Sequence, residues 1–147
     1  MKKIFIFDAY SSNRDLLCEA LAAQGNTVVA TGQLEMVRDS VERLKPDLII
    51  LDLYFRGEIR WDLLLEMKAF HPHVPVLILT GYLPPEDLRV HFADAWVRTS
   101  LFFMELKQKI TPLLDGFKEP GAVRGNSPRT SANEWLRSHL SATNSSA

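Results

Sequence analysis

Short runs of consecutive apolar residues constrain the fold of this chain more than any other feature of its sequence. The runs are about four residues long and lack the apolar–polar alternation of a half-exposed strand, so they indicate strands buried on both faces of a sheet. Stretches with helical spacing separate them. Strands are therefore expected at residues 4–7, 27–30, 48–51, 76–79 and 95–97.

The stretches between these runs have apolar residues on one helical face, such as Leu17 and Leu21. Strands that alternate with helices predict right-handed crossovers and a parallel sheet covered by helices on both faces. We therefore predict an α/β fold with five strands in the order 2-1-3-4-5 and five flanking helices. Helix boundaries are expected at Ser11-Ser12, Lys45-Pro46, His71-Pro72 and 84–87, and a fifth helix is expected to open with Leu101, Phe102 and Phe103.

The composition predicts one soluble domain followed by a tail. Residues 1–114 carry the alternating pattern, whereas residues 115–147 are rich in Gly, Ser, Pro and Asn and are expected to be mostly disordered, with a short helix at 133–140. The net charge of −1 argues against nucleic-acid binding, and no apolar run is long enough for a membrane span. The single cysteine, Cys18, is typical of a reducing compartment, so a cytoplasmic location is expected.

Polar residues follow three of the expected strands directly. Asp8 follows the first, Asp52 the third and Thr80 the fourth. Open parallel sheets bind ligands outside the carboxyl ends of their strands, so these side chains should converge on one edge. In the order 2-1-3-4-5 the first and third strands are neighbours, so Asp8 and Asp52 should form a close pair of like charges. Such a pair favours a raised pKa or a bound cation such as Mg²⁺.

The sequence resembles the receiver domain of bacterial two-component response regulators, a flavodoxin-like fold of which the chemotaxis regulators are members. The resemblance spans residues 2–114. It implies that Asp52 is the phosphoacceptor, that Thr80 is the switch hydroxyl, and that Asp8, Asp52 and the backbone carbonyl of Tyr54 bind Mg²⁺. The matching segments are Ile4-Phe5-Ile6-Phe7-Asp8 with Arg14, Pro46-Asp47-Leu48-Ile49-Ile50-Leu51-Asp52-Leu53, and Pro75-Val76-Leu77-Ile78-Leu79-Thr80-Gly81.

Several positions depart from the family pattern. Receivers usually end their first strand with two acids, but the second is Ala9 here, which should weaken Mg²⁺ binding. The Lys-Pro pair that closes the fifth strand of the family is Thr99-Ser100, so the lysine that contacts the phosphoryl group is missing. Arg98 and Arg56 are two alternative sources of positive charge. The Met-Pro pair after the phosphoacceptor is replaced by Phe55-Arg56, and a later Gly by Arg60.

Three functions are compatible with the sequence. The first is a receiver domain in phosphorelay signalling, with no DNA-binding output domain, that is phosphorylated on Asp52 and acts by binding other proteins. It is not an enzyme beyond self-phosphorylation and autodephosphorylation. Its expected partners are a sensor histidine kinase or phosphotransfer protein, an unknown output protein, and a second copy contacted through the fourth helix, fifth strand and fifth helix.

The second function is a pseudo-receiver that binds proteins without phosphorylation. The third, a flavodoxin-like binding protein or enzyme, is disfavoured because no glycine-rich phosphate loop is present.

Overall fold

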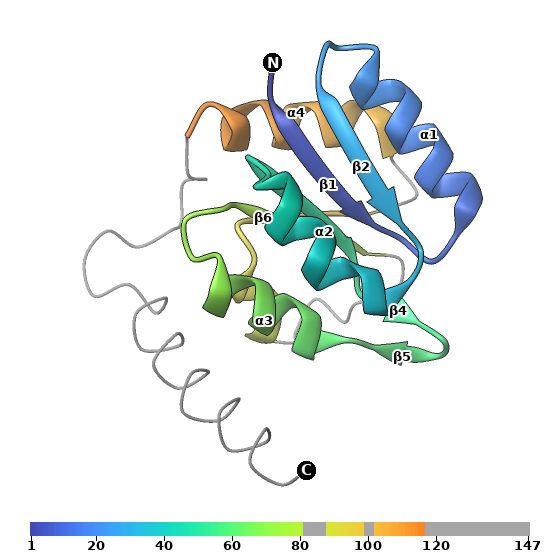
Figure 1. Cartoon of the computed structure of the whole chain (residues 1–147), viewed down its shortest axis with the longest axis vertical. Coiled ribbons are helices and arrows are strands. Elements are labelled where there is room, and N and C mark those ends of the chain that lie inside the picture. Colours follow the sequence, from blue (N-terminus) through green and yellow to red (C-terminus); the bar gives the residue numbers. More distant parts are fainter. Residues whose placement is uncertain (81–87, 99–101, 117–147) are drawn as a thin grey trace, which may run out of the picture.

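Five parallel strands form one sheet in the order β2-β1-β3-β6-β7 (Figure 1). The structure is a computed structural model that describes residues 1–80, 88–98 and 102–116. Counted along the chain, these strands have the predicted order 2-1-3-4-5, and each contains one of the predicted apolar runs. Their bounds are β1 (Lys3–Phe7), β2 (Thr27–Thr31), β3 (Leu48–Asp52), β6 (Val76–Thr80) and β7 (Ala95–Arg98).

Within the described residues, four α-helices cover the two faces of this sheet. Helices α2 (Val37–Leu44) and α3 (Trp61–Phe70) pack on the face that is nearer the viewer in Figure 1. Helices α1 (Ser11–Ala22) and α4 (Phe102–Leu114) pack on the other face. The three central strands, β1, β3 and β6, contribute to both cores because successive side chains point to opposite faces, which explains why their apolar runs are continuous. In β1, for example, Phe5 and Phe7 face α2 and α3, whereas Ile4 and Ile6 face α1 and α4.

Prolines and a left-handed residue end the helices where the sequence predicts. Helix α2 ends at Leu44. The Lys45 N–H still donates to the Val41 carbonyl at 3.0 Å, but Lys45 itself has φ 51° and so leaves the helical conformation. The chain then enters Pro46, which disfavours a helical residue before it. Helix α3 likewise ends at Phe70, just before His71-Pro72.

Some helical segments differ from the sequence prediction. The expected start of the fourth helix at 84–87 lies outside the described residues, and the segment that follows, Leu88–Phe92, is a 3₁₀ helix (η2). A second 3₁₀ helix, η1 (Leu34–Met36), precedes α2 where one continuous helix was expected. The fifth predicted helix is α4, which begins at Phe102. The tail from residue 117 onward, with its predicted helix at 133–140, lies outside the described residues.

A small antiparallel hairpin follows β3 and was not predicted. It consists of β4 (Tyr54–Phe55) and β5 (Glu58–Ile59), and a two-residue turn joins them. Arg56 has φ 51° and Gly57 has φ 84°, which is the pair of positive angles that a tight hairpin turn of this length requires. The Phe55 ring packs on Phe7 with a centroid distance of 5.8 Å and anchors the hairpin to the core.

A buried ion pair ties the opposite, amino-terminal edge of the sheet together. The Lys68 ammonium of α3 lies 2.6 Å from Asp94, and the two side chains are only 7% and 6% exposed. Lys68 also donates to the Val74 carbonyl at 3.2 Å, and Asp94 accepts the Val76 amide at 2.9 Å. This cluster joins α3 to the start of β6 and to the residue before β7. In the described part of the chain, no helix is both long and apolar enough to span a membrane.

Candidate functional site: an acidic pair at the carboxyl edge

Asp8 and Asp52, the acidic pair, lie side by side at the edge where the strands end. Strands β1 and β3 pair in parallel with Phe7 opposite Leu51, so the next residues along, Asp8 and Asp52, lie next to each other. Asp8 is 0% exposed and Asp52 is 5% exposed. Buried carboxylates are rare unless they are compensated, so this pair is the strongest candidate for a functional site. The sequence prediction that the two acids converge is confirmed.

Both acids make the same local turn. Oδ1 of Asp8 accepts the Tyr10 amide at 2.9 Å, and Oδ1 of Asp52 accepts the Tyr54 amide at 3.0 Å. A short acidic side chain that accepts the amide two residues later stabilises the turn that leaves the strand. Each carboxylate is thus anchored through one oxygen, which leaves the other oxygen for a different partner.

The second oxygen of Asp8 has no such partner within the described residues. Oδ2 of Asp8 is buried and makes no hydrogen bond there. Buried polar atoms in native proteins are nearly always satisfied, by protein, by water or by an ion. An unsatisfied carboxylate oxygen beside a second carboxylate fits the oxygen ligands that Mg²⁺ prefers. The residues at this edge therefore fit a divalent cation held by Asp8 and Asp52.

Burial disfavours the charged forms of both acids. Burial raises the pKa of Asp52 to about 6; the Tyr54 amide opposes this shift, and the negative charge of Asp8 adds to it. Burial also raises the pKa of Asp8, against the Tyr10 amide, the nearby positive charge of Arg14 and the neighbouring Asn13 side chain. The folded protein therefore holds two carboxylates in a place where ionisation is costly without a cation.

The other predicted site residues are only partly placed. Thr80 ends β6, and Leu79 is paired with Asp52, so the backbone brings Thr80 to the same edge. Its role as a switch hydroxyl remains a prediction. Tyr54 opens β4 and is paired there with Ile59, and its role as a carbonyl ligand also remains a prediction.

Positive charge near the acidic pair is limited. Arg56, one of the two alternatives to the missing lysine, sits at the tip of the β4–β5 hairpin, where its guanidinium lies 5.0 Å from the centre of the Phe55 ring. Arg60 forms an ion pair with Asp62 at 2.8 Å.

Arg98, the other alternative, ends β7 opposite Thr80, and Thr99-Ser100 lie outside the described residues. The structure adds Arg14, whose contact with Asp8 the sequence analysis missed.

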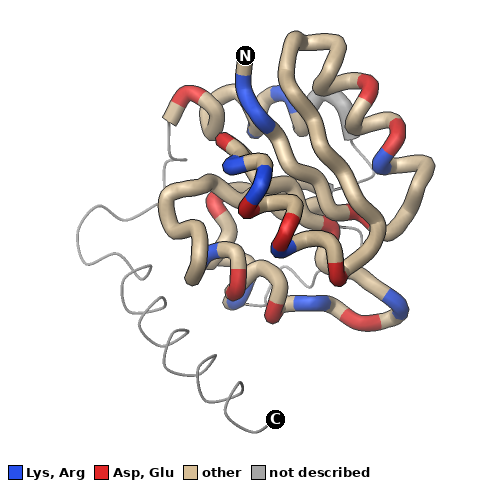
Figure 2. The backbone as a smooth tube through the Cα atoms, viewed as in Figure 1, with Lys and Arg blue, Asp and Glu red and all other residues tan. Residues whose placement is uncertain are grey.

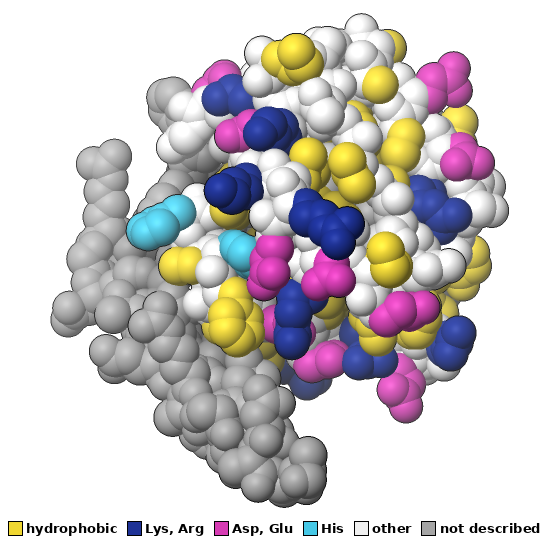
Figure 3. Space-filling model, viewed as in Figure 1, with side chains coloured by type: hydrophobic (Ala, Val, Ile, Leu, Met, Phe, Trp, Pro, Cys, Tyr) yellow, Lys and Arg dark blue, Asp and Glu magenta, His cyan; other side chains and the backbone are white. Residues whose placement is uncertain are grey.

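Elsewhere on the described surface, charges of both signs are mixed. Figure 2 shows Lys and Arg interspersed with Asp and Glu along the helices. The same mixture gathers over α2 and α3 on the face seen in Figure 3, where Arg38 of α2 donates to Glu66 of α3 at 2.7 Å. The described residues contain no group of three His, Cys, Asp or Glu side chains that could hold a metal ion, so the acidic pair has two carboxylates and no third.

Solved structures that match this fold include response regulators and their receiver domains. The response regulator TrrA from Thermotoga maritima, in complex with Mg²⁺ and BeF, is 29% identical, with a TM-score of 0.70; the match covers 77% of this chain and 99% of TrrA. A structure of the histidine kinase ThkA in complex with TrrA matches with the same identity and TM-score, over 78% of this chain and 99% of that chain.

More distant receivers share the fold. The receiver domain of a DNA-binding response regulator from Colwellia psychrerythraea is 20% identical, with a TM-score of 0.70 and coverage of 78% of this chain and 99% of its own. The chemotaxis protein CheY4 from Vibrio cholerae is 19% identical, with a TM-score of 0.68 and coverage of 77% and 98%. No protein-family model matches the sequence, and neither does a curated protein. The chain thus has the fold of response-regulator receiver domains, as its sequence predicts, and it is a divergent example of that fold.

Proposed function

We propose that this chain is a receiver domain in phosphorelay signalling and that it accepts a phosphoryl group on Asp52. The observation that carries this proposal is the buried acidic pair, in which Asp52 ends β3 beside an Asp8 whose Oδ2 has no hydrogen bond within the described residues. A purely structural role would call for a compensated charge, such as the ion pair between Lys68 and Asp94. The acidic pair suits a cation and an incoming phosphoryl group instead.

The proposed Mg²⁺ ligands are Asp8, Asp52 and the backbone carbonyl of Tyr54. When bound, Mg²⁺ supplies the positive charge that phosphoryl transfer requires. The neighbouring structure that contains Mg²⁺ and BeF is TrrA, a receiver that is 29% identical to this chain. Ala9 leaves this chain one carboxylate short of the family pattern, so we expect weaker Mg²⁺ binding than in receivers with two acids after the first strand.

The transfer itself needs an ionised nucleophile in line with the donor. An oxygen of the Asp52 carboxylate forms a bond to phosphorus while the bond between phosphorus and the leaving group breaks, and the leaving group keeps the bonding electron pair. The hydroxyl of Thr80 then hydrogen-bonds a phosphoryl oxygen. Because burial raises the pKa of Asp52 to about 6, the nucleophile is mostly ionised at neutral pH and loses its charge in mild acid.

The proposed partners follow from this chemistry. A histidine kinase or phosphotransfer protein would supply the phosphoryl group, as the complex of ThkA with TrrA suggests for that pair. Output would be binding to another protein or to a second copy of this chain, shifted between two conformations by phosphorylation. The surface proposed for a second copy comprises η2, β7 and α4, and Trp96 on β7 is 41% exposed there.

A pseudo-receiver is the second candidate, and two departures from the family pattern favour it. The acidic pair has two carboxylates where the family pattern gives three, since Ala9 follows Asp8, and the family lysine is replaced by Thr99. In that case the fold would serve as a protein-binding module whose state does not depend on phosphorylation.

Phosphoryl labelling separates the two candidates. The full chain is incubated with acetyl phosphate and MgCl₂, and intact mass is measured over time. We expect a mass increase of one phosphoryl group that is absent without Mg²⁺ and absent in Asp52→Asn. Asp47→Asn is a matched control, because this aspartate is exposed at the other end of β3. Labelling that persists in Asp52→Asn would move the phosphoacceptor elsewhere, and no labelling of the unmodified chain would leave the pseudo-receiver.

A further inference from the structure

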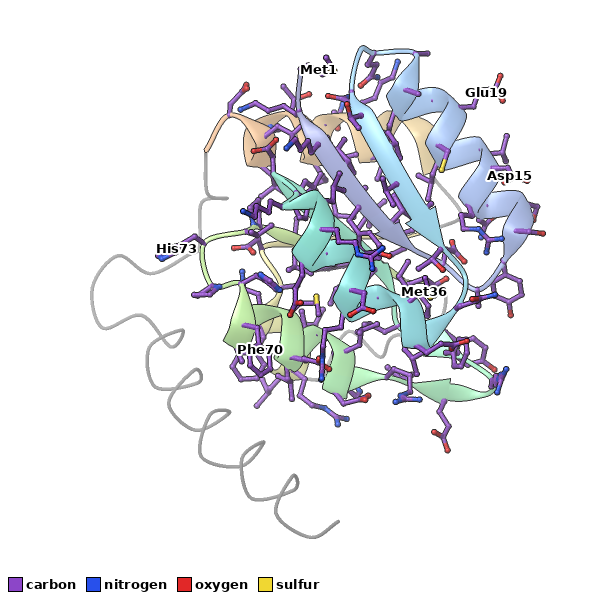
Figure 4. The ribbon with its side chains drawn as sticks, viewed as in Figure 1. Met1, Asp15, Glu19, Met36, Phe70 and His73 are labelled. Atoms are coloured by element: carbon purple, nitrogen blue, oxygen red, sulfur yellow. The ribbon has the colours of Figure 1, made fainter. Side chains whose placement is uncertain are left out.

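Arg14 makes an inward contact that Asp15 and Glu19 of the same helix do not make. Its Nη1 donates to the backbone carbonyl of Asp8 at 2.8 Å, across the turn between β1 and α1. The side chain is half-buried, whereas Asp15 and Glu19 of the same helix are exposed and project away from the sheet (Figure 4). The contact therefore joins the first turn of α1 to the residue that carries the unsatisfied carboxylate oxygen.

Gly32 provides the space for this contact. It follows β2, and a Cβ at this position would lie 2.2 Å from Nη1 of Arg14 and 3.2 Å from the Asp8 carbonyl oxygen. A distance of 2.2 Å is well inside van der Waals contact, so any side chain here would displace the guanidinium. No positive φ requires a glycine at this position, in contrast to Gly25 and Gly57. Its lack of a side chain instead lets Arg14 lie over the end of β2.

The same turn also carries the departure from the family pattern. Ala9 follows Asp8, so Asp8 is the only carboxylate that the turn after β1 offers to a cation. Oδ1 of Asp8 is already engaged by the Tyr10 amide, which leaves Oδ2. The position of this one side chain therefore decides most of what the turn can contribute to binding.

We propose that Arg14, lying over Gly32, is the positioning residue of the acidic pair. By tying the Asp8 carbonyl, it fixes the turn after β1 and with it the direction of the Asp8 carboxylate. The proposal rests on the proposed function in one respect, which is that the acidic pair holds Mg²⁺. Arg14 itself touches neither the cation nor the phosphoryl group.

Two backbone amides report on the two acids separately. Tyr10 donates to Asp8 and Tyr54 donates to Asp52, so the ¹H–¹⁵N resonances of these amides can be followed in the full chain with and without MgCl₂. In metal-free protein, Arg14→Ala and Gly32→Ala should each shift the Tyr10 amide and leave the Tyr54 amide nearly unchanged. Arg43→Ala, which removes an exposed arginine of α2, should move neither amide.

The Mg²⁺ dissociation constant then tests the effect on binding. Each single substitution should weaken Mg²⁺ binding about fivefold, which is the loss expected from one positioning hydrogen bond of ~1 kcal/mol. Gly32→Ala leaves the charge of the chain unchanged, so its effect isolates geometry. Because both substitutions break the same contact, the double variant should bind no more weakly than Arg14→Ala alone. Arg14→Lys should recover part of the affinity.

The outcomes that would overturn the proposal are distinct from failure of the proposed function. Tighter Mg²⁺ binding in Arg14→Ala would show that Arg14 acts only as a repelling charge. Additive effects of the two substitutions would show that Gly32 does not act through Arg14. If the unmodified chain binds no Mg²⁺, the proposed function fails, and an unmoved Tyr10 amide in metal-free Arg14→Ala would by itself refute the positioning role.

Discussion

The two edges of the sheet treat buried charge in opposite ways. At the amino edge, Lys68 and Asp94 form an ion pair that is also bonded to the backbone at Val74 and Val76. At the carboxyl edge, Asp8 and Asp52 place two like charges side by side, and burial raises the pKa of both. Both clusters are buried, but among the described residues only the one at the amino edge contains an ion pair.

This difference separates a structural cluster from a candidate functional site. A compensated ion pair holds elements together and leaves nothing for a ligand to satisfy. An uncompensated pair destabilises the metal-free fold, and a bound cation would recover that free energy.

Removing the positive charge of Lys68 at the amino edge should have the largest effect on stability. Lys68→Met leaves Asp94 buried without its counter-charge, so we expect the free energy of unfolding to fall by about 3–5 kcal/mol. Urea denaturation measures this change. Adding Asp94→Asn to Lys68→Met should recover part of the loss. The exposed pair of Arg38 and Glu66 is the control, since Arg38→Ala should cost less than ~1 kcal/mol. Similar losses for Lys68→Met and Arg38→Ala would show that the buried ion pair contributes no more to stability than a surface pair.

Neutralising Asp52 at the carboxyl edge should instead stabilise the metal-free protein. The pKa of Asp52 is about 6 in the folded protein, against an ordinary value of 3.8, so the folded state holds a proton that the unfolded state has released between these values. The stability contributed by protonated Asp52 is therefore lost as pH rises from about 4 to about 6, and it stays lost at neutral pH.

Asp52→Asn should accordingly raise the free energy of unfolding by about 2–3 kcal/mol at neutral pH without Mg²⁺. The gain should disappear below the ordinary carboxyl pKa, and urea denaturation across the pH range measures it. Asp62→Asn is the matched control with the opposite sign, because Arg60 lowers the pKa of Asp62. A destabilised Asp52→Asn at neutral pH would mean that the protein already compensates this charge.

Mg²⁺ should compensate part of the buried negative charge at the carboxyl edge and so stabilise the protein. At about ten times its dissociation constant, MgCl₂ should stabilise the unmodified chain by about 1.4 kcal/mol and should leave Asp52→Asn nearly unchanged.

Ala9→Asp restores a second acid after β1, so it should tighten Mg²⁺ binding about tenfold, or ~1.4 kcal/mol, and destabilise the metal-free protein. Calorimetric titration gives the affinities. Unchanged affinity in Ala9→Asp would argue against the weakening attributed to Ala9.

The sequence allowed the carboxyl edge to be predicted far better than the amino edge. Asp8 and Asp52 directly follow apolar runs, and a parallel sheet brings strand ends to one edge, so their proximity follows from pattern and topology. Lys68 and Asp94 carry no such signal. A lysine in a helix is usually exposed, and only the packing of α3 against the start of β6 buries this one.

The β4–β5 hairpin and the contact of Arg14 were missed for related reasons. Strands of two residues are too short to show periodicity, and Arg56-Gly57 lacks the Asn-Gly or Asp-Gly signature of a hairpin turn. Arg14 was recognised as part of the matching segment, but its role depends on the empty space at Gly32, a residue distant along the chain.

By itself, the sequence determined the class of fold, the order of the strands and the meeting of Asp8 with Asp52. These depend on local apolar pattern and on the handedness of strand connections, which act within each segment and its neighbours. The tertiary structure alone decided which charges are compensated, because compensation depends on side chains that approach from distant segments. It pairs Lys68 with Asp94, brings Arg14 to the Asp8 carbonyl over Gly32, and leaves Oδ2 of Asp8 without a partner among the described residues.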